Sequence, residues 1–337
     1  MSDLAATAKA LVAPGKGILA ADESSGTIEK RFTAVGVEST EESRRAYRDL
    51  LFTTEGAAEF VSGVILFDET IRQRSADGTP FPELLERQGV IPGIKVDEGA
   101  KPLALCPGET VTEGLDGLRE RFEEYRALGA RFAKWRGVIS IGPEIPSETC
   151  LSVNAHALAR YAALAQEAGL VPIVEPEVLM DGDHTIERSF DVTSRMQRAV
   201  FEALEVQRVA LDGMLLKPNM VLSGYECPEQ AGVEDVARAT LRCLRLGVPS
   251  EVPGIVFLSG GQSDEVATEH LNAIATASGP KPWELSFSYG RALQAAAQQA
   301  WAGRPENVPA AQAAYLHRAR MNGAARSGTW SAGLESG

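Results

Sequence analysis

The sequence predicts an α/β protein folded as a single (β/α)8 barrel, the TIM-barrel architecture. Eight short apolar segments recur along the 337 residues, and segments with helical periodicity separate many of them. The apolar segments return every ~30 to ~45 residues, which is the length of one strand plus one crossover helix. Because the segments are apolar along nearly their whole length, a closed parallel barrel is favoured over an open sheet.

The expected strands are apolar runs that end in polar or charged residues, as buried parallel strands do. In chain order they are 17–22, 61–67, 91–96, 131–136, 171–177, 213–217, 254–259 and 285–289.

The expected helices show an apolar residue every three or four positions. In chain order they are an alanine-rich leading helix within 1–17, then 113–128, 154–168, 189–207, 233–246 and 264–278. Several are followed by glycine, the usual C-terminal stop signal. No linker or block of charge divides the chain, so we expect one domain spanning 1–337. The segment 327–337 is rich in Gly and Ser, which predicts a mobile tail.

Composition narrows the classes of function. The net charge is −13 and the isoelectric point is about 5.0. A negatively charged chain repels phosphate backbones and anionic lipid, which argues against nucleic acid or a membrane surface as partner. No segment approaches the roughly 18 uninterrupted apolar residues of a membrane span, and the N-terminus lacks a signal-peptide pattern. We therefore expect a cytoplasmic protein.

Neither cysteine nor histidine spacing indicates a metal site. The cysteines are far apart and form no CxxC pair: Cys106, Cys150, Cys227 and Cys243. The histidines likewise show no ligand spacing: His156, His184, His270 and His317. We expect no metal and no cofactor.

Charged residues collect at the ends of the expected strands, where barrels carry their active sites. They are Asp22 and Glu23 at the first strand, Lys95 and Asp97 at the third, Lys134 and Arg136 at the fourth, Glu175 and Glu177 at the fifth, Lys217 at the sixth, and Arg291 after the eighth. Charges are costly in an apolar strand unless they are paired or functional. Each has a simpler alternative when read alone: Lys217 could turn to solvent, and Asp22 could cap a helix with Ser24.

Read together, these residues point to imine chemistry. An amine attacks a carbonyl only when unprotonated, so a nucleophilic lysine needs desolvation or a nearby cation. Lys134 could be that cation for Lys217. The iminium withdraws electrons and lets the adjacent carbon–carbon bond break, and carboxylates must then move protons. Glu175 and Asp22 are placed for this role, although a structural ion-pair network would use the same residue types.

Glycine-rich turns after the last two strands predict a phosphate site. Barrels commonly bind phosphate through the loops after strands seven and eight. The segments are Ser259-Gly260-Gly261 and Tyr289-Gly290-Arg291. Glycine lets the backbone approach an anion closely, and Arg291 can bind it with two parallel hydrogen bonds.

Seven motifs together resemble class I fructose-bisphosphate aldolase over about residues 16 to 315. They are Leu19-Ala-Ala-Asp-Glu-Ser24, Gly93-Ile-Lys-Val-Asp97, Phe132-Ala-Lys-Trp-Arg136, Val174-Glu-Pro-Glu177, Leu215-Leu-Lys-Pro-Asn-Met220, Phe257-Leu-Ser-Gly-Gly-Gln262 and Phe287-Ser-Tyr-Gly-Arg-Ala-Leu-Gln294. The resemblance implies reversible cleavage of fructose 1,6-bisphosphate to dihydroxyacetone phosphate and glyceraldehyde 3-phosphate, in glycolysis and gluconeogenesis. It also implies a homotetramer.

The resemblance assigns roles to individual residues. Lys217 would be the Schiff-base lysine, Glu175 the acid/base of imine formation, Asp22 the group that handles the hydroxyl proton, Lys134 its cationic partner, and Glu177 would orient Lys217 or its neighbours. The ketone-side phosphate would bind at Ser259, Gly260, Gly261, Tyr289, Gly290 and Arg291; the other phosphate would have Ser24, Arg31, Lys95 and Arg136 as candidates.

One departure and three alternatives stay open. Animal members of the family use a C-terminal tyrosine in enamine proton transfer, and this sequence ends Leu-Glu-Ser-Gly without it. The alternatives are another imine-forming lyase, such as a deoxyribose-phosphate or transaldolase-like enzyme, a zinc-dependent aldolase in which His184 is the histidine nearest the active face, and a barrel that has lost catalysis.

Overall fold

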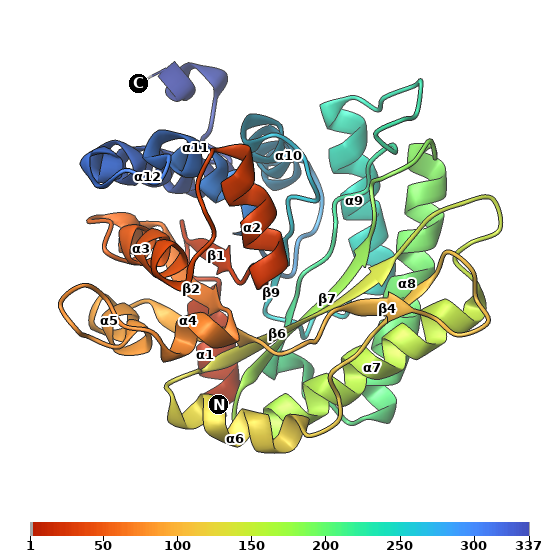
Figure 1. Ribbon diagram of the computed structural model, residues 1–337. Coiled ribbons are helices and arrows are strands. Elements are labelled where there is room, and N and C mark those ends of the chain that lie inside the picture. The colour runs from red at the N-terminus through yellow and green to blue at the C-terminus, as the bar shows by residue number, and fades with distance from the viewer. Residues whose placement is uncertain (1–2, 337) are drawn as a thin grey trace.

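Eight apolar strands pair side by side and close into a parallel barrel in the computed structural model, which describes residues 3–336 (Figure 1). The order around the barrel is β1, β2, β3, β6, β7, β8, β9 and β10, and β10 closes on β1. The bounds are β1 Gly17–Ala21, β2 Val61–Leu66, β3 Ile91–Lys95, β6 Phe132–Ile139, β7 Val171–Val178, β8 Leu215–Leu216, β9 Gly254–Phe257 and β10 Glu284–Tyr289. The expected fold class is confirmed, and each of the eight expected strands coincides with one of these.

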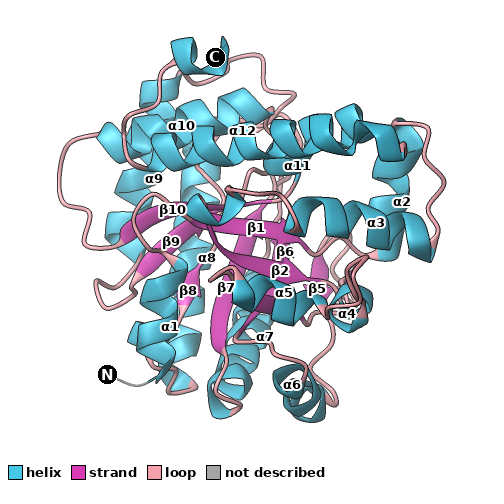
Figure 2. Ribbon diagram, turned by 90° about the vertical axis from the view of Figure 1, so that its left-hand side faces the viewer, coloured by secondary structure: helices cyan, strands magenta, loops and turns pink. Residues whose placement is uncertain are grey.

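Helices surround the strands on the outside of the barrel (Figures 1 and 2). They are α1 Asp3–Leu11, α2 Ser25–Ala34, α3 Glu41–Phe52, α4 Asp68–Arg72, α5 Phe81–Arg87, α6 Leu118–Ala127, α7 Glu148–Glu167, α8 Ile186–Val206, α9 Val233–Gly247, α10 Asp264–Thr276, α11 Arg291–Trp301 and α12 Val308–Arg326. Within the described residues, no helix is both long enough and apolar enough to cross a bilayer.

The barrel interior is a small apolar core of its own. Side chains from β1, β2, β7, β8 and β9 meet there, and α1 adds Leu11 to the same cluster. Phe132 lies in this core as well, and a Cβ atom on Gly93 would overlap its ring. Glycine in β3 therefore makes room for an aromatic side chain in β6. Packed side chains fill this end of the barrel, which leaves the opposite end for chemistry.

The segment before α6 differs from the expectation in two ways. A two-stranded hairpin, β4 Ala100–Pro102 and β5 Thr110–Thr112, precedes α6. The helix expected from residue 113 begins only at Leu118, because Gly114 and Gly117 have φ values of 119° and 67°. These left-handed conformations cannot belong to a right-handed helix.

The C-terminal segment lies against α12. Glu335, in the short 3₁₀ helix Ala332–Ser336, forms an ion pair with Arg318 and accepts a hydrogen bond of 2.9 Å from the Trp330 indole nitrogen. The mobile tail at 327–337 stays a prediction, and Gly337 lies outside the described residues.

Candidate active site

Strand register places the predicted charged residues at one level of the barrel. Lys95 of β3 pairs with Lys134 of β6, and Arg136 of β6 pairs with Glu175 of β7. Leu216 pairs with Val174, so Lys217 follows at the level of Glu175. Trp135 belongs to the core outside the barrel wall and stacks on Tyr161 of α7 with ring centroids 5.6 Å apart. Since side chains alternate along a strand, Lys134 and Arg136 face inward.

A chain of short polar contacts joins four of the predicted residues. The Lys217 Nζ atom lies 3.1 Å from Glu175 Oε1, and the other oxygen of Glu175 lies 3.2 Å from Lys134 Nζ. Lys134 Nζ also lies 2.8 Å from Asp22 Oδ2. Lys217, Glu175 and Lys134 are only 4%, 3% and 3% exposed. Two lysine side chains and two carboxyl side chains therefore alternate in a site nearly closed to bulk water.

The electrostatics of this cluster keep its charges in place. Burial alone would favour the neutral acid, but Lys134 and Lys217 outweigh it and hold the pKa of the Asp22 carboxyl well below its usual value. Burial likewise disfavours the Lys134 ammonium, yet the surrounding carboxylates raise its pKa above the usual value. Asp22 and Lys134 thus stay ionised through the neutral pH range.

Asp97 belongs to the cluster, although no role was predicted for it. Its Oδ2 atom lies 3.9 Å from Lys134 Nζ and accepts a hydrogen bond of 3.3 Å from the Arg136 backbone. Its Oδ1 atom lies 2.7 Å from Lys95 Nζ. Asp97 therefore links the lysines of β3 and β6. Its place in the Lys-Val-Asp motif could have indicated a role. However, Asp97 lies after the end of β3, where strand alternation no longer predicts which way a side chain points.

Glu177 has an arginine partner, and its expected role of orienting Lys217 or its neighbours stays a prediction. It forms an ion pair with Arg136, and within residues 3–336 it makes no ion pair or hydrogen bond with Lys217. Two ion pairs join β6 to β7, because Arg136 pairs with Glu177 and Lys134 with Glu175.

The two glycine-rich turns meet at the barrel mouth. Gly260 and Gly261 have φ values of 57° and 95°, which favour glycine, and Ser259 before them is buried. A Cβ atom on Gly261 would lie 2.8 Å from Arg291 Nη2, so the loop after β9 contacts the start of α11. Tyr289 is not part of this group by its side chain, since its hydroxyl donates to the Ala267 carbonyl at 3.0 Å within the helical layer.

Arg31 lies beside the same turns, on the β1 side. A Cβ atom on Gly290 would lie 3.8 Å from Arg31 Nη2. Arg31 is held by an ion pair with Glu23, and the other oxygen of Glu23 lies 2.6 Å from the buried Arg48. The structure thus places Arg31 near the predicted ketone-side phosphate turns, while Lys95 lies across the mouth with Asp97.

Ser24 flanks this group. It precedes α2 without capping it by its side chain, and its hydroxyl lies 3.1 Å from the Thr27 hydroxyl. The helix-cap alternative therefore has no side-chain hydrogen bond to support it.

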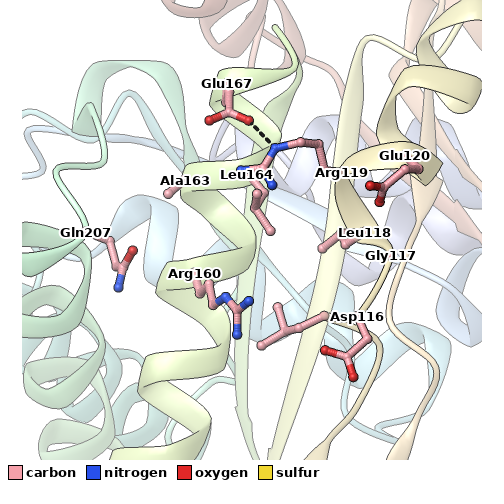
Figure 3. Close-up of a pocket in the computed structure, with 11 residues that line it drawn as sticks. Asp116, Gly117, Leu118, Arg119, Glu120, Arg160, Ala163, Leu164, Glu167 and Gln207 are labelled. Carbon is pink, nitrogen blue, oxygen red and sulfur yellow. Dashed lines mark hydrogen bonds and ion pairs between the residues drawn. The ribbon is translucent and has the colours of Figure 1, made fainter.

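Other polar sites offer less chemistry. Within residues 3–336, no three His, Cys, Asp or Glu side chains are grouped to hold a metal ion. His184 is buried, neither of its ring nitrogens has a hydrogen-bond partner in the described part of the chain, and burial lowers its pKa. A hollow on the outer surface between α6 and α7 contains Arg119 and Glu167, which pair with each other at 2.7 Å (Figure 3). None of the predicted site residues lines it.

Comparisons with known proteins agree on one family. The model of the family described as fructose-bisphosphate aldolase class-I matches residues 3–337. A "probable fructose-bisphosphate aldolase class 1" of Xanthomonas campestris is 60% identical and covers 98% of this chain and 99% of its own. A cytosolic fructose-bisphosphate aldolase of Arabidopsis thaliana is 53% identical and covers 97% of this chain and 83% of its own.

Solved structures agree with the sequence relatives. The fructose-bisphosphate aldolase of Plasmodium falciparum, solved with TRAP and a small-molecule inhibitor, is 51% identical. It superposes with a TM-score of 0.96 over 97% of this chain and 95% of its own. The similarity thus includes the whole barrel and every segment that supplies the charged cluster.

Proposed function

The chain belongs to the class I fructose-bisphosphate aldolase family, and we propose that its reaction proceeds through an imine on Lys217. The family's reaction is the reversible cleavage of fructose 1,6-bisphosphate into dihydroxyacetone phosphate and glyceraldehyde 3-phosphate, a step of glycolysis. The observation that carries the proposal is the buried contact of Lys217 Nζ with Glu175, 3.1 Å away.

Glu175 serves imine formation. Lys217 attacks the C2 carbonyl, and the resulting carbinolamine loses its hydroxyl as water to leave an iminium. Glu175 contacts the nitrogen of Lys217 with one oxygen and that of Lys134 with the other. It can therefore take a proton from the attacking amine and return it to the departing hydroxyl, as a general acid/base does. Hydrolysis of the imine later consumes the water that was released.

Asp22 serves bond cleavage. The iminium accepts the electron pair of the C3–C4 bond as that bond breaks, and the C4 hydroxyl becomes the aldehyde by losing its proton. Asp22 is ionised beside Lys134 Nζ, 2.8 Å away, and takes this proton. The enamine left on Lys217 is then protonated at C3, which balances the proton that Asp22 took up, and hydrolysis of the resulting iminium releases dihydroxyacetone phosphate. Lys134 balances the two carboxylates throughout.

The two phosphates bind at separate groups of residues. We assign the ketone-side phosphate to the Ser259–Gly261 turn and to Gly290 and Arg291, which meet at the mouth. Backbone N–H groups of such turns bind anions because their dipoles converge. Ser24, Lys95 and Arg136 remain the candidates for the other phosphate. Arg31 lies near Gly290 and can contribute from that side.

Reductive trapping tests the imine. Borohydride added with dihydroxyacetone phosphate reduces an iminium to a stable secondary amine, so we expect mass spectrometry to find the adduct on the peptide that carries Lys217. The variant Lys217→Met is the control and should gain no mass. An unmodified Lys217 peptide in active wild-type protein, or an adduct on Lys134 instead, would show that the nucleophile is misassigned.

We further propose that the chain acts as one domain in a cytoplasmic homotetramer. The cytosolic name of the Arabidopsis relative supports the location, and closure of the barrel by pairing of β1 with β10 supports the single domain. Light scattering on the purified protein should give about four chain masses. A monomer across the working concentration range would contradict the assembly.

A further inference from the structure

The loop that follows Lys217 is bonded to the loop that follows β7. Tyr225 donates its backbone N–H to the Met180 carbonyl at 2.9 Å, and Glu226 donates to Gly182 at 2.9 Å. Gly224 donates to His184 at 2.8 Å. The backbone of Tyr225 is therefore fixed by the neighbouring loop, although the residue is 46% exposed. A tyrosine held in this way has a defined direction at the barrel mouth.

The Tyr225 side chain reaches the glycine turn after β9. Its hydroxyl donates to the Gly260 carbonyl at 2.8 Å and lies 3.4 Å from the Met180 sulfur. A Cβ atom on Gly261 would lie 3.4 Å from this hydroxyl and 2.8 Å from Arg291 Nη2. The turn is thus enclosed by Tyr225, Met180 and Arg291. Two successive glycines have the largest conformational freedom of any dipeptide, so such contacts decide which conformation they keep.

The peptide bond between Gly260 and Gly261 fixes the direction of the Gly261 N–H. The carbonyl of Gly260 and the N–H of Gly261 belong to one planar trans peptide, so they point in opposite directions. A hydroxyl that holds the carbonyl on one side directs the N–H to the other. Among residues 3–336, no protein acceptor binds the Gly261 N–H. This donor is free for an anion next to Arg291.

We propose that Tyr225 is a positioning residue for the ketone-side phosphate. Its hydroxyl holds the Gly260–Gly261 peptide so that the Gly261 N–H faces the phosphate with Arg291. The inference rests on the phosphate assignment of the proposed function and names a residue outside that assignment. It predicts that loss of the hydroxyl weakens binding of the ketone half of the substrate and leaves the aldehyde half unaffected.

The chemical state of Tyr225 agrees with a structural donor. Burial raises the pKa of its hydroxyl to about 12, although nearby Arg291 acts in the opposite direction. The hydroxyl therefore keeps its proton at neutral pH and can donate it to the Gly260 carbonyl. A role in carrying the proton to the enamine is the competing explanation, and kinetics separate the two.

The test compares Tyr225→Phe with Tyr125→Phe. Each removes one hydroxyl that makes a hydrogen bond, but Tyr125 donates to Asp68 at 3.0 Å in the helical layer. One lost hydrogen bond corresponds to roughly three- to tenfold in an equilibrium constant. For Tyr225→Phe we expect the KM for fructose 1,6-bisphosphate and for dihydroxyacetone phosphate to rise about three- to tenfold. The KM for glyceraldehyde 3-phosphate and kcat should stay within about twofold of wild type, and Tyr125→Phe should match wild type.

Two results would overturn the inference. In the first, Tyr225→Phe leaves the KM for fructose 1,6-bisphosphate and the KM for dihydroxyacetone phosphate unchanged, while borohydride still traps Lys217. The positioning role is then wrong and the proposed function stands. If kcat and the release of tritium from labelled dihydroxyacetone phosphate both fall at unchanged KM, Tyr225 transfers a proton instead. Failure to trap Lys217 in wild-type protein would instead count against the proposed function.

Discussion

Replacing Lys217 by methionine is expected to abolish turnover while the barrel stays folded. Methionine keeps most of the length and volume of the lysine stem but has no amine, so no imine can form. Removal of a covalent nucleophile typically costs roughly 10⁵-fold or more in kcat. The measurement is the steady-state rate of fructose 1,6-bisphosphate cleavage. Traces of wild-type protein in the preparation set the lowest rate that can be assigned to the variant.

The structure explains why this variant should fold. Glu175 keeps the ammonium of Lys134 at 3.2 Å after Lys217 is removed, so no buried carboxylate loses its last counter-charge. A matched control is Lys281→Met, since that lysine is also partly buried and donates to the Ala277 carbonyl at 2.6 Å, outside the site. We expect Lys281→Met to keep full activity. Turnover by Lys217→Met within about tenfold of wild type would exclude an obligatory imine at this residue.

The cluster around Lys217 could be predicted because a simple rule governs it. Parallel strands in a barrel present their C-terminal ends at one edge, so charges that end separate strands must lie near one another. Alternation along a strand added that Lys134 and Arg136 share a side, as do Glu175 and Glu177. The rule does not reveal which cation meets which carboxylate. The pairing of Glu177 with Arg136 depends on the register of β6 and β7, which no local sequence signal states.

Residues beyond the strands were harder to predict. Tyr289 shares a face of its strand with Leu285 and Phe287, so alternation groups it with apolar side chains but does not predict that its hydroxyl donates to the Ala267 carbonyl. Asp97 and Tyr225 lie in irregular loops, where the direction of a side chain depends on contacts made after folding. The helical pattern of the sequence begins at residue 113, but α6 begins only at Leu118. The left-handed conformations of Gly114 and Gly117 keep the preceding residues out of the helix.

Replacing Lys134 by methionine is expected to damage both catalysis and stability, and the loss of stability should grow with pH. Its ammonium lies 2.8 Å from Asp22, 3.2 Å from Glu175 and 3.9 Å from Asp97. Without it, three carboxylates face one another in a nearly dry site. Removal of one partner from a buried ion pair typically costs about 3–5 kcal/mol. We also expect kcat to fall on the order of 10²- to 10⁴-fold, because Asp22 and Glu175 both lose the neighbouring positive charge of Lys134 during proton transfer.

The pH dependence of stability follows from the direction in which the Asp22 pKa is shifted. In the wild-type protein the pKa of Asp22 is lowered, so the ionised group stabilises the fold above its unfolded value of about 3.9, and that contribution is lost as pH falls. Without Lys134, burial dominates and raises the Asp22 pKa, so stability is lost as pH rises through the new value. Urea unfolding at pH 5 and pH 8 should therefore show a larger deficit for Lys134→Met at pH 8.

The double variant Lys134→Met with Asp22→Asn separates charge balance from packing. Asparagine removes one of the three carboxylates at nearly constant volume, so the stability deficit at pH 8 should shrink relative to Lys134→Met alone, while activity stays low because the proposed proton acceptor is also gone. A deficit that is equal at both pH values, and unchanged in the double variant, would mean that Lys134 stabilises the barrel by packing. The carboxylates beside Lys134 would then be ionised for another reason. The explanation of the ionised state of Asp22 by its contact with Lys134 would be wrong.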